Sequence, residues 1–186
     1  MSGWHAAAMA DAEVLLIGGR AGVGKTTVGW EVSARLRAAE VGHAVIDGDF
    51  MGQVHPAPEG DPHRAAITER NLTAVWANYT ALGCRRLVYV NTVSVLAEAE
   101  GIFRGAMGDG VRLVRVLLTA TDRTAELRLR GREIGSEFEH ELRGSVRKAR
   151  MLDERAPGDT LRVATDGRSV IDIADEVVRA TGWVTR

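Results

Sequence analysis

The sequence predicts an α/β domain in which helices cover both faces of a five-stranded parallel β-sheet. Short apolar segments alternate with segments of helical periodicity along most of the chain. A glycine-rich stretch, residues 19–26, joins the first apolar segment to the first helical one. Strand, helix and strand in succession form a crossover unit, and such units build parallel sheets that are buried on both faces.

Periodicity and turn residues place the individual elements. Val28, Val32 and Leu36 recur at helical spacing, and Gly42 ends that helix. Residues 50–63 hold three of the four prolines, so we expect a loop or a short lid there. The expected strands are residues 13–18, 43–46, 86–90, 112–118 and 161–164. The expected helices are residues 27–39, 65–82, 95–103, 122–132, 138–155 and 169–181.

A few residues outside the motifs receive structural roles. We expect Thr121 or Asp122 to cap the fourth helix, with Glu126 as the partner in a capping box. Trp30 and Trp183 are expected to be packing residues.

Length, composition and charge narrow the class of protein. A chain of 186 residues with 45% hydrophobic and 26% charged residues is typical of one globular domain with a sizeable core. A net charge of −1 gives no general attraction to nucleic acid or to acidic membranes, and no apolar run is long enough to span a membrane. The single cysteine, Cys84, excludes an internal disulfide. We therefore expect a cytoplasmic protein with a flexible tail at residues 1–12 and one domain at residues 13–186.

The glycine-rich stretch has the G-x-x-x-x-G-K-[ST] spacing of a phosphate-binding P-loop. Its glycines let successive N–H groups turn inward around phosphate oxygens, and the following helix adds the positive end of its dipole. Lys25, one of only two lysines in the chain, supplies a cation for the β- and γ-phosphates, and the Thr26 hydroxyl can hold Mg²⁺. The residues expected to bind the nucleotide here are Gly19, Ala21, Gly22, Val23, Gly24, Lys25, Thr26 and Thr27.

Two carboxylates follow the second expected strand. Asp47 and Asp49 lie where that strand ends, and ligands of parallel sheets bind at the carboxyl ends of the strands. One carboxylate can hold Mg²⁺ through water, and the other can orient or deprotonate an attacking hydroxyl. We assign Asp47 to the metal and Asp49 to the hydroxyl, but the sequence leaves open which of the two is the base. The alternative is an ordinary Asp-Gly turn.

Basic residues after the fourth strand predict a lid at about residues 128–140. Arg128 and Arg132 lie four residues apart and so share one helical face. Arginine can stack on a base and can bind phosphate oxygens with its planar fork. The alternative is a solvated basic face. After the last strand, Asp166 and Gly167 can touch a nucleotide base through backbone groups, or they form a plain strand-to-helix turn.

The order of these motifs resembles the small P-loop kinases of the nucleoside-monophosphate-kinase-like group. This group includes shikimate and gluconate kinases, adenylylsulfate kinase and chloramphenicol phosphotransferase. Asp47-Gly48-Asp49 looks like the D-G-D of adenylylsulfate kinase, Arg128 and Arg132 look like the paired lid arginines, and Asp166-Gly167 looks like the adenine loop. The resemblance implies a three-layer P-loop NTPase fold with the strand order 2-3-1-4-5. It also implies ATP with Mg²⁺ as the phosphoryl donor.

Departures from the group also carry information. The third strand ends in Asn91-Thr92, without the glycine triplet of shikimate kinase and without an acidic Walker B residue. Only Arg64 and Arg70 are candidates to grip an anionic acceptor, which favours a neutral or weakly anionic acceptor such as a sugar, a nucleoside or an antibiotic. The absence of an N-K-x-D motif favours ATP over GTP.

The sequence therefore predicts an ATP-dependent phosphotransferase that moves the γ-phosphoryl group to a hydroxyl of a small molecule. In this interpretation Thr26 and Asp47 hold Mg²⁺, and the catalytic residues are Lys25, Asp49, Arg132 and Arg128. The sequence names neither the acceptor nor the oligomeric state. The alternative is a nucleotide-binding regulatory protein or an NTPase without a small-molecule acceptor.

Overall fold

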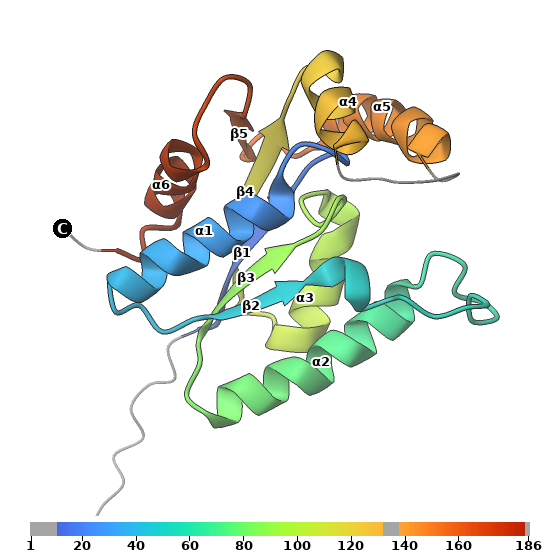
Figure 1. Cartoon of the computed structure of the whole chain (residues 1–186). Coiled ribbons are helices and arrows are strands. Elements are labelled where there is room, and N and C mark those ends of the chain that lie inside the picture. The colour runs from blue at the N-terminus through green and yellow to red at the C-terminus, as the bar shows by residue number, and fades with distance from the viewer. Residues whose placement is uncertain (1–10, 132–137, 185–186) are drawn as a thin grey trace, which may run out of the picture.

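A computed structural model describes residues 11–131 and 138–184 of the chain. Its strands form one parallel sheet of five strands in the order β2-β3-β1-β4-β5 (Figure 1). The strands are β1 (Glu13–Gly18), β2 (Ala44–Asp47), β3 (Arg86–Val90), β4 (Arg112–Thr119) and β5 (Leu161–Ala164). The fold class and the strand order expected from the sequence are both confirmed.

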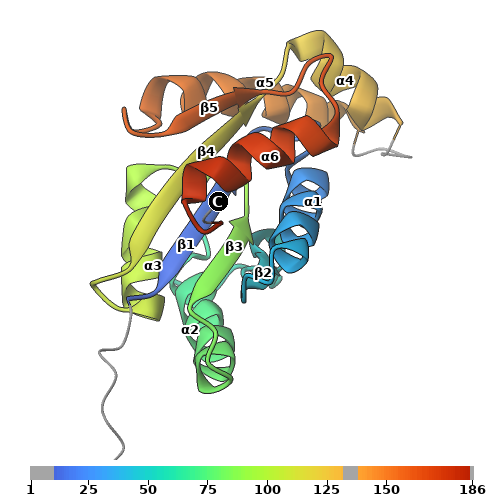
Figure 2. The ribbon, with the colours of Figure 1, turned by 90° about the vertical axis from the view of Figure 1, so that its left-hand side faces the viewer.

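Helices lie on both faces of this sheet. They are α1 (Lys25–Ala38), α2 (Ala65–Ala81), α3 (Glu100–Met107), α4 (Asp122–Arg130), α5 (Phe138–Arg155) and α6 (Val170–Thr181). Two short 3₁₀ helices, η1 (Gly48–Phe50) and η2 (Ala97–Ala99), follow β2 and β3. Figure 2 shows α1 and α6 together on one side of the sheet, and α2 and α3 cover the other side.

The central strand β1 is apolar on both faces. Leu15 and Ile17 belong to the core under α1 and α6, whereas Val14 and Leu16 belong to the core under α2 and α3. All four side chains are completely buried. Burial on both faces explains why this strand has a continuous apolar run rather than an alternating pattern.

The carboxyl ends of three neighbouring strands finish at the same level of the sheet. Ile17 of β1 pairs with Val90 of β3, and Val90 pairs in turn with Asp47 of β2. Beyond the strands, the Gly19 N–H donates to the Thr92 carbonyl at 3.2 Å. The loops that follow β1, β2 and β3 therefore begin side by side, as the edge that binds ligands in parallel sheets requires.

The helices differ from the prediction most clearly in two places, and several other helix ends differ by one or two residues. Helix α1 begins at Lys25, slightly earlier than expected, because Gly24 is its N-cap. The helix expected at residues 95–103 is split between η2 and α3. Val95 and Leu96 are apolar because they are buried in the turn after β3, not because they form one face of a helix.

The cap of α4 is partly as expected. Thr121 is the N-cap, and its hydroxyl accepts a hydrogen bond from the Thr124 N–H at 3.3 Å. The expected role of Glu126 in a capping box is wrong, because its carboxylate accepts a hydrogen bond from Arg130 at 2.6 Å instead. Glu126 is too far along the helix to reach back to the cap, and a partner four residues on is within reach.

The two tryptophans behave differently. Trp183 is buried in the core under α6, and its Nε1 donates to the Glu13 carboxylate at 3.0 Å. The expected packing role of Trp30 is wrong, since 58% of its surface is exposed. Trp30 lies on α1 between buried positions, and neighbours in helix sequence do not share a face.

Parts of two expectations lie outside the described residues. The expected tail at residues 1–12 is described only from residue 11, and the expected lid at residues 128–140 lacks residues 132–137, including Arg132. The division into a tail and one domain with a lid stays a prediction. None of the described helices is long and apolar enough to cross a membrane.

Candidate active site

The loop after β1 ends in a helix N-terminus that no side chain caps. Gly24 adopts a left-handed conformation with φ 99°, and the first turn of α1 contains no acidic residue. A Cβ at Gly24 would meet no atom within 4 Å, so the loop faces open space here. The first N–H groups of a helix have no partner within the helix, and their positive dipole end favours an anion. This arrangement fits the predicted phosphate-binding role of the loop.

Lys25 lies over the loop, and its Nζ donates to the Arg20 carbonyl at 3.2 Å. The Arg20 side chain is buried behind the loop and forms an ion pair with Asp122 at the start of α4. Its Nε donates to the Ser145 hydroxyl on α5 at 2.8 Å, and that hydroxyl donates to the Ala21 carbonyl at 2.9 Å. Two later helices therefore brace the phosphate loop from behind.

Thr26 and Asp47 meet at the edge of the sheet, as predicted. The Thr26 hydroxyl lies 3.5 Å from Oδ2 of Asp47, and Oδ1 of Asp47 accepts a hydrogen bond from the Asp49 N–H at 3.1 Å. A hydroxyl and a carboxylate are the hard oxygen ligands that Mg²⁺ prefers. Among the residues that the structure describes, no group of three His, Cys, Asp or Glu side chains could hold a metal alone. The pair therefore fits a cation that takes its other ligands from phosphates and water.

Asp49 has an orienting partner that sequence reasoning missed. Nδ2 of Asn91, just after β3, donates to Oδ1 of Asp49 at 2.7 Å. The Asn91 side-chain oxygen accepts a hydrogen bond from the Val93 N–H at 3.0 Å, which fixes the nitrogen toward Asp49. The only signal in the sequence was a polar residue at the end of a buried strand.

Gly48, between the two aspartates, permits a close approach to Tyr89. A Cβ at this position would lie 2.2 Å from the Tyr89 ring. Burial raises the pKa of the Tyr89 hydroxyl far above its usual value, and the charges of Asp49 and Asp47 raise it further. The hydroxyl therefore stays protonated and can act as a hydrogen-bond donor beside the carboxylates.

A cavity of about 540 Å³ opens beside Asp49 and Asn91. Its other walls come from η1, the loop after it and the start of α2, so the region expected as a loop or lid does border the site. Arg64 lines this cavity in a left-handed conformation, with its Nε donating to the Val54 carbonyl at 3.1 Å. Arg70 is exposed on α2 and does not line the cavity.

Arg128 bridges two loops on the other side of the P-loop. One of its terminal nitrogens donates to the Val23 carbonyl at 3.1 Å and to the Thr165 hydroxyl at 3.0 Å. The other donates to the Thr165 carbonyl at 3.1 Å. The guanidinium therefore joins the P-loop to the loop after β5. Its predicted catalytic role stays a prediction, and its predicted partner Arg132 lies outside the described residues.

Asp166 joins the loop after β5 to the cap of α4. Its carboxylate accepts hydrogen bonds from the Thr121 hydroxyl at 2.8 Å and from the Thr121 N–H at 3.2 Å. Hydrogen bonds from Thr124 and Thr121 hold the pKa of Asp166 below its usual value. Because the side chain is occupied, only backbone groups of Asp166 and Gly167 remain for the predicted contact with a base, and that contact stays a prediction.

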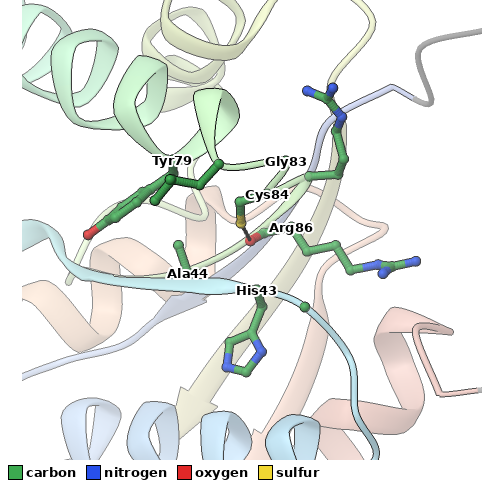
Figure 3. Close-up of a pocket in the computed structure, with 9 residues that line it drawn as sticks. His43, Ala44, Tyr79, Gly83, Cys84 and Arg86 are labelled. Atoms are coloured by element: carbon green, nitrogen blue, oxygen red, sulfur yellow. Dashed lines mark hydrogen bonds between the residues drawn. The ribbon is translucent and has the colours of Figure 1, made fainter.

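A separate hollow of about 480 Å³ lies at the opposite end of β2 and β3 (Figure 3). His43 at its edge interacts with the Ser33 hydroxyl at 2.8 Å and the Val41 carbonyl at 2.7 Å. Cys84 donates to the Arg86 carbonyl at 3.3 Å. Its lining includes none of the predicted site residues, so it is distinct from the phosphate-binding edge.

Comparison with known proteins identifies the fold. No protein-family model and no curated protein sequence matches the chain. The structure is similar to the APS kinase CysC of Mycobacterium tuberculosis, solved with AMPPNP and APS. The two chains are 23% identical with a TM-score of 0.55, and the match covers 91% of this chain and 97% of that chain. The structure is also similar to a tunicamycin resistance protein of Deinococcus radiodurans, with 18% identity and a TM-score of 0.61, and this match covers 92% of this chain and 96% of that chain. A gluconokinase of Sinorhizobium meliloti is 17% identical with a TM-score of 0.57, covering 91% of each chain.

These similarities and the strand order define the class of fold. The chain has the P-loop NTPase α/β fold, with the glycine-rich loop between β1 and α1. The likeness extends over nearly the whole of each neighbouring chain and not over a fragment.

Proposed function

We propose that the protein is an ATP-dependent phosphotransferase that moves the γ-phosphoryl group of ATP to a hydroxyl group of a small molecule. The observation that carries the proposal is the convergence of three features at one edge of the sheet. The first is the uncapped N-terminus of the P-loop helix, and the second is the Thr26–Asp47 pair. The third is the Asp49 carboxylate, which is held by a hydrogen bond from Asn91 and lines a cavity. The kinase fold of the structural neighbours supports the same class of activity.

The donor side binds and orients the triphosphate. Backbone N–H groups of the loop and the ammonium of Lys25 hold the phosphate oxygens, for which Lys25 exchanges its contact with the Arg20 carbonyl. Thr26 and Asp47 would hold Mg²⁺, which supplies positive charge to the phosphates when it is bound. Arg128, whose guanidinium donates to the Val23 carbonyl of the P-loop, would contact the bound nucleotide beside that loop.

Asp49 acts on the acceptor. Its carboxylate accepts the proton of the acceptor hydroxyl while the hydroxyl oxygen forms a bond to the γ-phosphorus. The bond from the γ-phosphorus to the bridging oxygen breaks, and ADP leaves with the electron pair of that bond. Asn91 keeps the reacting carboxylate in position through the 2.7 Å hydrogen bond. Asp49 is exposed, as an acceptor entering from solvent requires.

A nucleotide-binding regulator or an NTPase without an acceptor is the alternative. It needs no cavity beside Asp49, and the 540 Å³ space there favours the phosphotransferase. The two functions separate in one assay. ADP release from Mg-ATP is measured alone and in the presence of a set of hydroxylated metabolites, nucleosides and antibiotics. A phosphotransferase is stimulated by an acceptor and forms a phosphorylated product, whereas the alternative shows neither.

The Asp49→Asn variant tests the assignment of the base. It should bind Mg-ATP with unchanged affinity by calorimetry but lose about a hundredfold or more of acceptor phosphorylation. Asp109→Asn, at an exposed aspartate after α3, is the matched control and should keep full activity. Full activity of Asp49→Asn on an acceptor that the wild type phosphorylates would contradict the role of Asp49.

A further inference from the structure

A second cavity, of about 290 Å³, adjoins the first one at Asn91. Gly48, His63, Thr68 and Asn91 line both cavities, so a single ligand can occupy the two spaces at once. The second cavity extends away from the P-loop toward η2 and α3. The acceptor space is therefore larger and more varied in chemistry than the region beside Asp49 alone.

The two cavities have different walls. The one that reaches α3 is lined mainly by apolar side chains, with Leu96, Ala99, Ile102 and Phe103 on the η2 and α3 side. Phe103 is buried and packs edge-on against Tyr89, with ring centroids 5.0 Å apart and planes at 84°. An arrangement of this kind is rigid and prefers an apolar occupant.

The cavity beside Asp49 is polar instead. Two histidines and Arg64 line it, and the Nε of Arg64 is already bonded to the Val54 carbonyl. The terminal nitrogens of a guanidinium held in this way can donate hydrogen bonds to an oxygen-rich substituent of a ligand. Among the described residues that line the apolar cavity there is no lysine or arginine, His63 lies at the junction of the two spaces, and Glu98 supplies the one carboxylate. The position of an anionic group, if the acceptor has one, is therefore restricted to the polar cavity.

Tyr89 offers a polar group to an occupant of the apolar cavity. Its side chain is 3% exposed and lines this cavity, and burial keeps its hydroxyl protonated by raising its pKa. A phenolic hydroxyl can donate a hydrogen bond. An acceptor that reaches this cavity can therefore accept a hydrogen bond from Tyr89 with one oxygen or nitrogen atom.

We propose that the phosphoryl acceptor is an amphipathic molecule with a compact apolar group, such as an aryl ring or a branched alkyl group, beside its reactive hydroxyl. The hydroxyl lies at Asp49, the apolar group fills the space against Ile102 and Phe103, and polar substituents lie toward Arg64. A cavity of roughly 150 Å³ holds benzene, so about 290 Å³ accommodates a substituted ring. This inference rests on the proposed phosphotransferase activity and narrows its substrate class.

Matched pairs of acceptors test the inference. Methyl and phenyl β-glucosides share their hydroxyl groups and differ in one apolar group, and methyl and phenyl β-ribofuranosides form a second pair. Phosphorylation of each compound is measured from labelled Mg-ATP. Compounds with the ring should have a kcat/KM at least about tenfold higher than their partners without it, because a filled apolar pocket adds at least this factor.

Two alanines of η2 provide a matched pair of variants. Ala99→Phe places a ring in the apolar cavity, whereas Ala97 is exposed and does not line the cavity, so Ala97→Phe is the control. Ala99→Phe should lose the preference for ring-bearing acceptors but keep its affinity for Mg-ATP, and the control should keep both. If Ala99→Phe does not fold, Ile102→Ala serves instead, because the larger cavity should shift the preference from phenyl toward naphthyl glucosides.

Each outcome separates the inference from the proposed function. Equal use of the polar and the ring-bearing partners, or a preference that survives Ala99→Phe unchanged, overturns the amphipathic acceptor and leaves the phosphotransferase intact. Failure of every ring-bearing compound to be phosphorylated by a wild-type protein that binds Mg-ATP overturns it too. Absence of Mg-ATP binding in the wild type overturns the proposed function itself.

Discussion

The donor side and the acceptor side of the candidate site are built in different ways. On the donor side one continuous stretch, residues 19–26, forms the phosphate loop mainly from its own backbone. On the acceptor side the walls come from η1, the loop after it, α2, β3 and α3, and side chains determine the chemistry. A site made of backbone depends on glycine spacing, whereas a site made of distant side chains depends on the whole fold. The comparison explains why the donor is easier to infer than the acceptor.

The largest effect is expected on the donor side, from Lys25→Ala. Loss of the ammonium removes charge from the transferred phosphoryl group and should lower acceptor phosphorylation about a hundredfold or more. The chain offers its other lysine as a control, because Lys148 is exposed on α5 and Lys148→Ala should keep wild-type turnover. Turnover is measured as phosphorylated product per enzyme under saturating Mg-ATP. Equal activity of the two variants would remove Lys25 from the catalytic residues.

A smaller effect is expected on the acceptor side, from Asn91→Ala. The variant removes the 2.7 Å hydrogen bond that aims Asp49, so kcat should fall about tenfold while the calorimetric affinity for Mg-ATP stays the same. Asn78→Ala, at an exposed asparagine on α2, is the control. A loss of Mg-ATP affinity equal to the loss in kcat would mean that Asn91 supports the donor side, and the division between the two sides would fail.

The brace behind the P-loop gives a third prediction. Ser145→Ala removes a partner of the Arg20 guanidinium and a donor to the Ala21 carbonyl, and it leaves buried polar groups unsatisfied. We expect a destabilisation of about 1–3 kcal/mol and a several-fold weaker binding of Mg-ATP. The control is Arg147→Ala, on an exposed position of the same helix. Chemical unfolding and calorimetry measure the two quantities, and unchanged values for Ser145→Ala would show that the brace has no energetic role.

The smallest effect is expected at the far end of the sheet, where Glu13 is bonded to Arg112 and Trp183. Burial raises the pKa of Glu13, but the hydrogen bonds from Arg112 and Trp183 outweigh burial, so the pKa lies below the ordinary 4.5. A lowered pKa stabilises the fold above the unfolded-state value, and this stabilisation is lost as the pH falls through the folded-state value. Glu13→Gln should therefore lower the melting temperature at pH 7 by a few degrees, and the difference should shrink below about pH 4.5.

The exposed Glu154 on α5 provides the control for this measurement, and Glu154→Gln should melt like the wild type at both pH values. Acceptor phosphorylation by Glu13→Gln should stay at the wild-type level at pH 7, because Glu13 lies at the amino end of β1 and the site lies at the carboxyl ends. A melting difference for Glu13→Gln that grows as the pH falls would contradict the assigned direction of the pKa shift.

The same contrast explains what the sequence predicts and what it does not. The P-loop context and the meeting of Thr26 with Asp47 follow from local patterns, since the strand ends of a parallel sheet share one edge. The strand order was expected only from the resemblance to the small P-loop kinases, because local patterns do not determine which strands are neighbours. The roles of Asn91 and Tyr89 depend on contacts between β2 and β3 that only the folded register creates. Arg20 stands at a variable position of the motif, so nothing in the local sequence indicated its partners on α4 and α5.

Sequence periodicity was misleading where burial and helical spacing coincide by chance. Val95 and Leu96 fitted a helix but lie in a buried turn. Trp30 was expected to be a packing residue, although its position on α1 faces solvent. In each case the burial or exposure of the side chain depends on elements that come from other parts of the chain. The volume and the walls of the acceptor cavities are properties of the same kind, which is why their chemistry emerged only from the fold.

The most direct test of the account is a calorimetric titration of the wild-type protein with Mg-ATP, together with Mg-GTP as the comparison ligand. The wild-type protein should bind Mg-ATP saturably with a dissociation constant below about 1 mM, and it should bind Mg-GTP more weakly. The Gly24→Val variant should lose Mg-ATP binding, because a side chain at this left-handed position closes the open anion site of the glycine-rich loop. No heat and no complex of the wild type with either nucleotide at millimolar concentration would contradict the account.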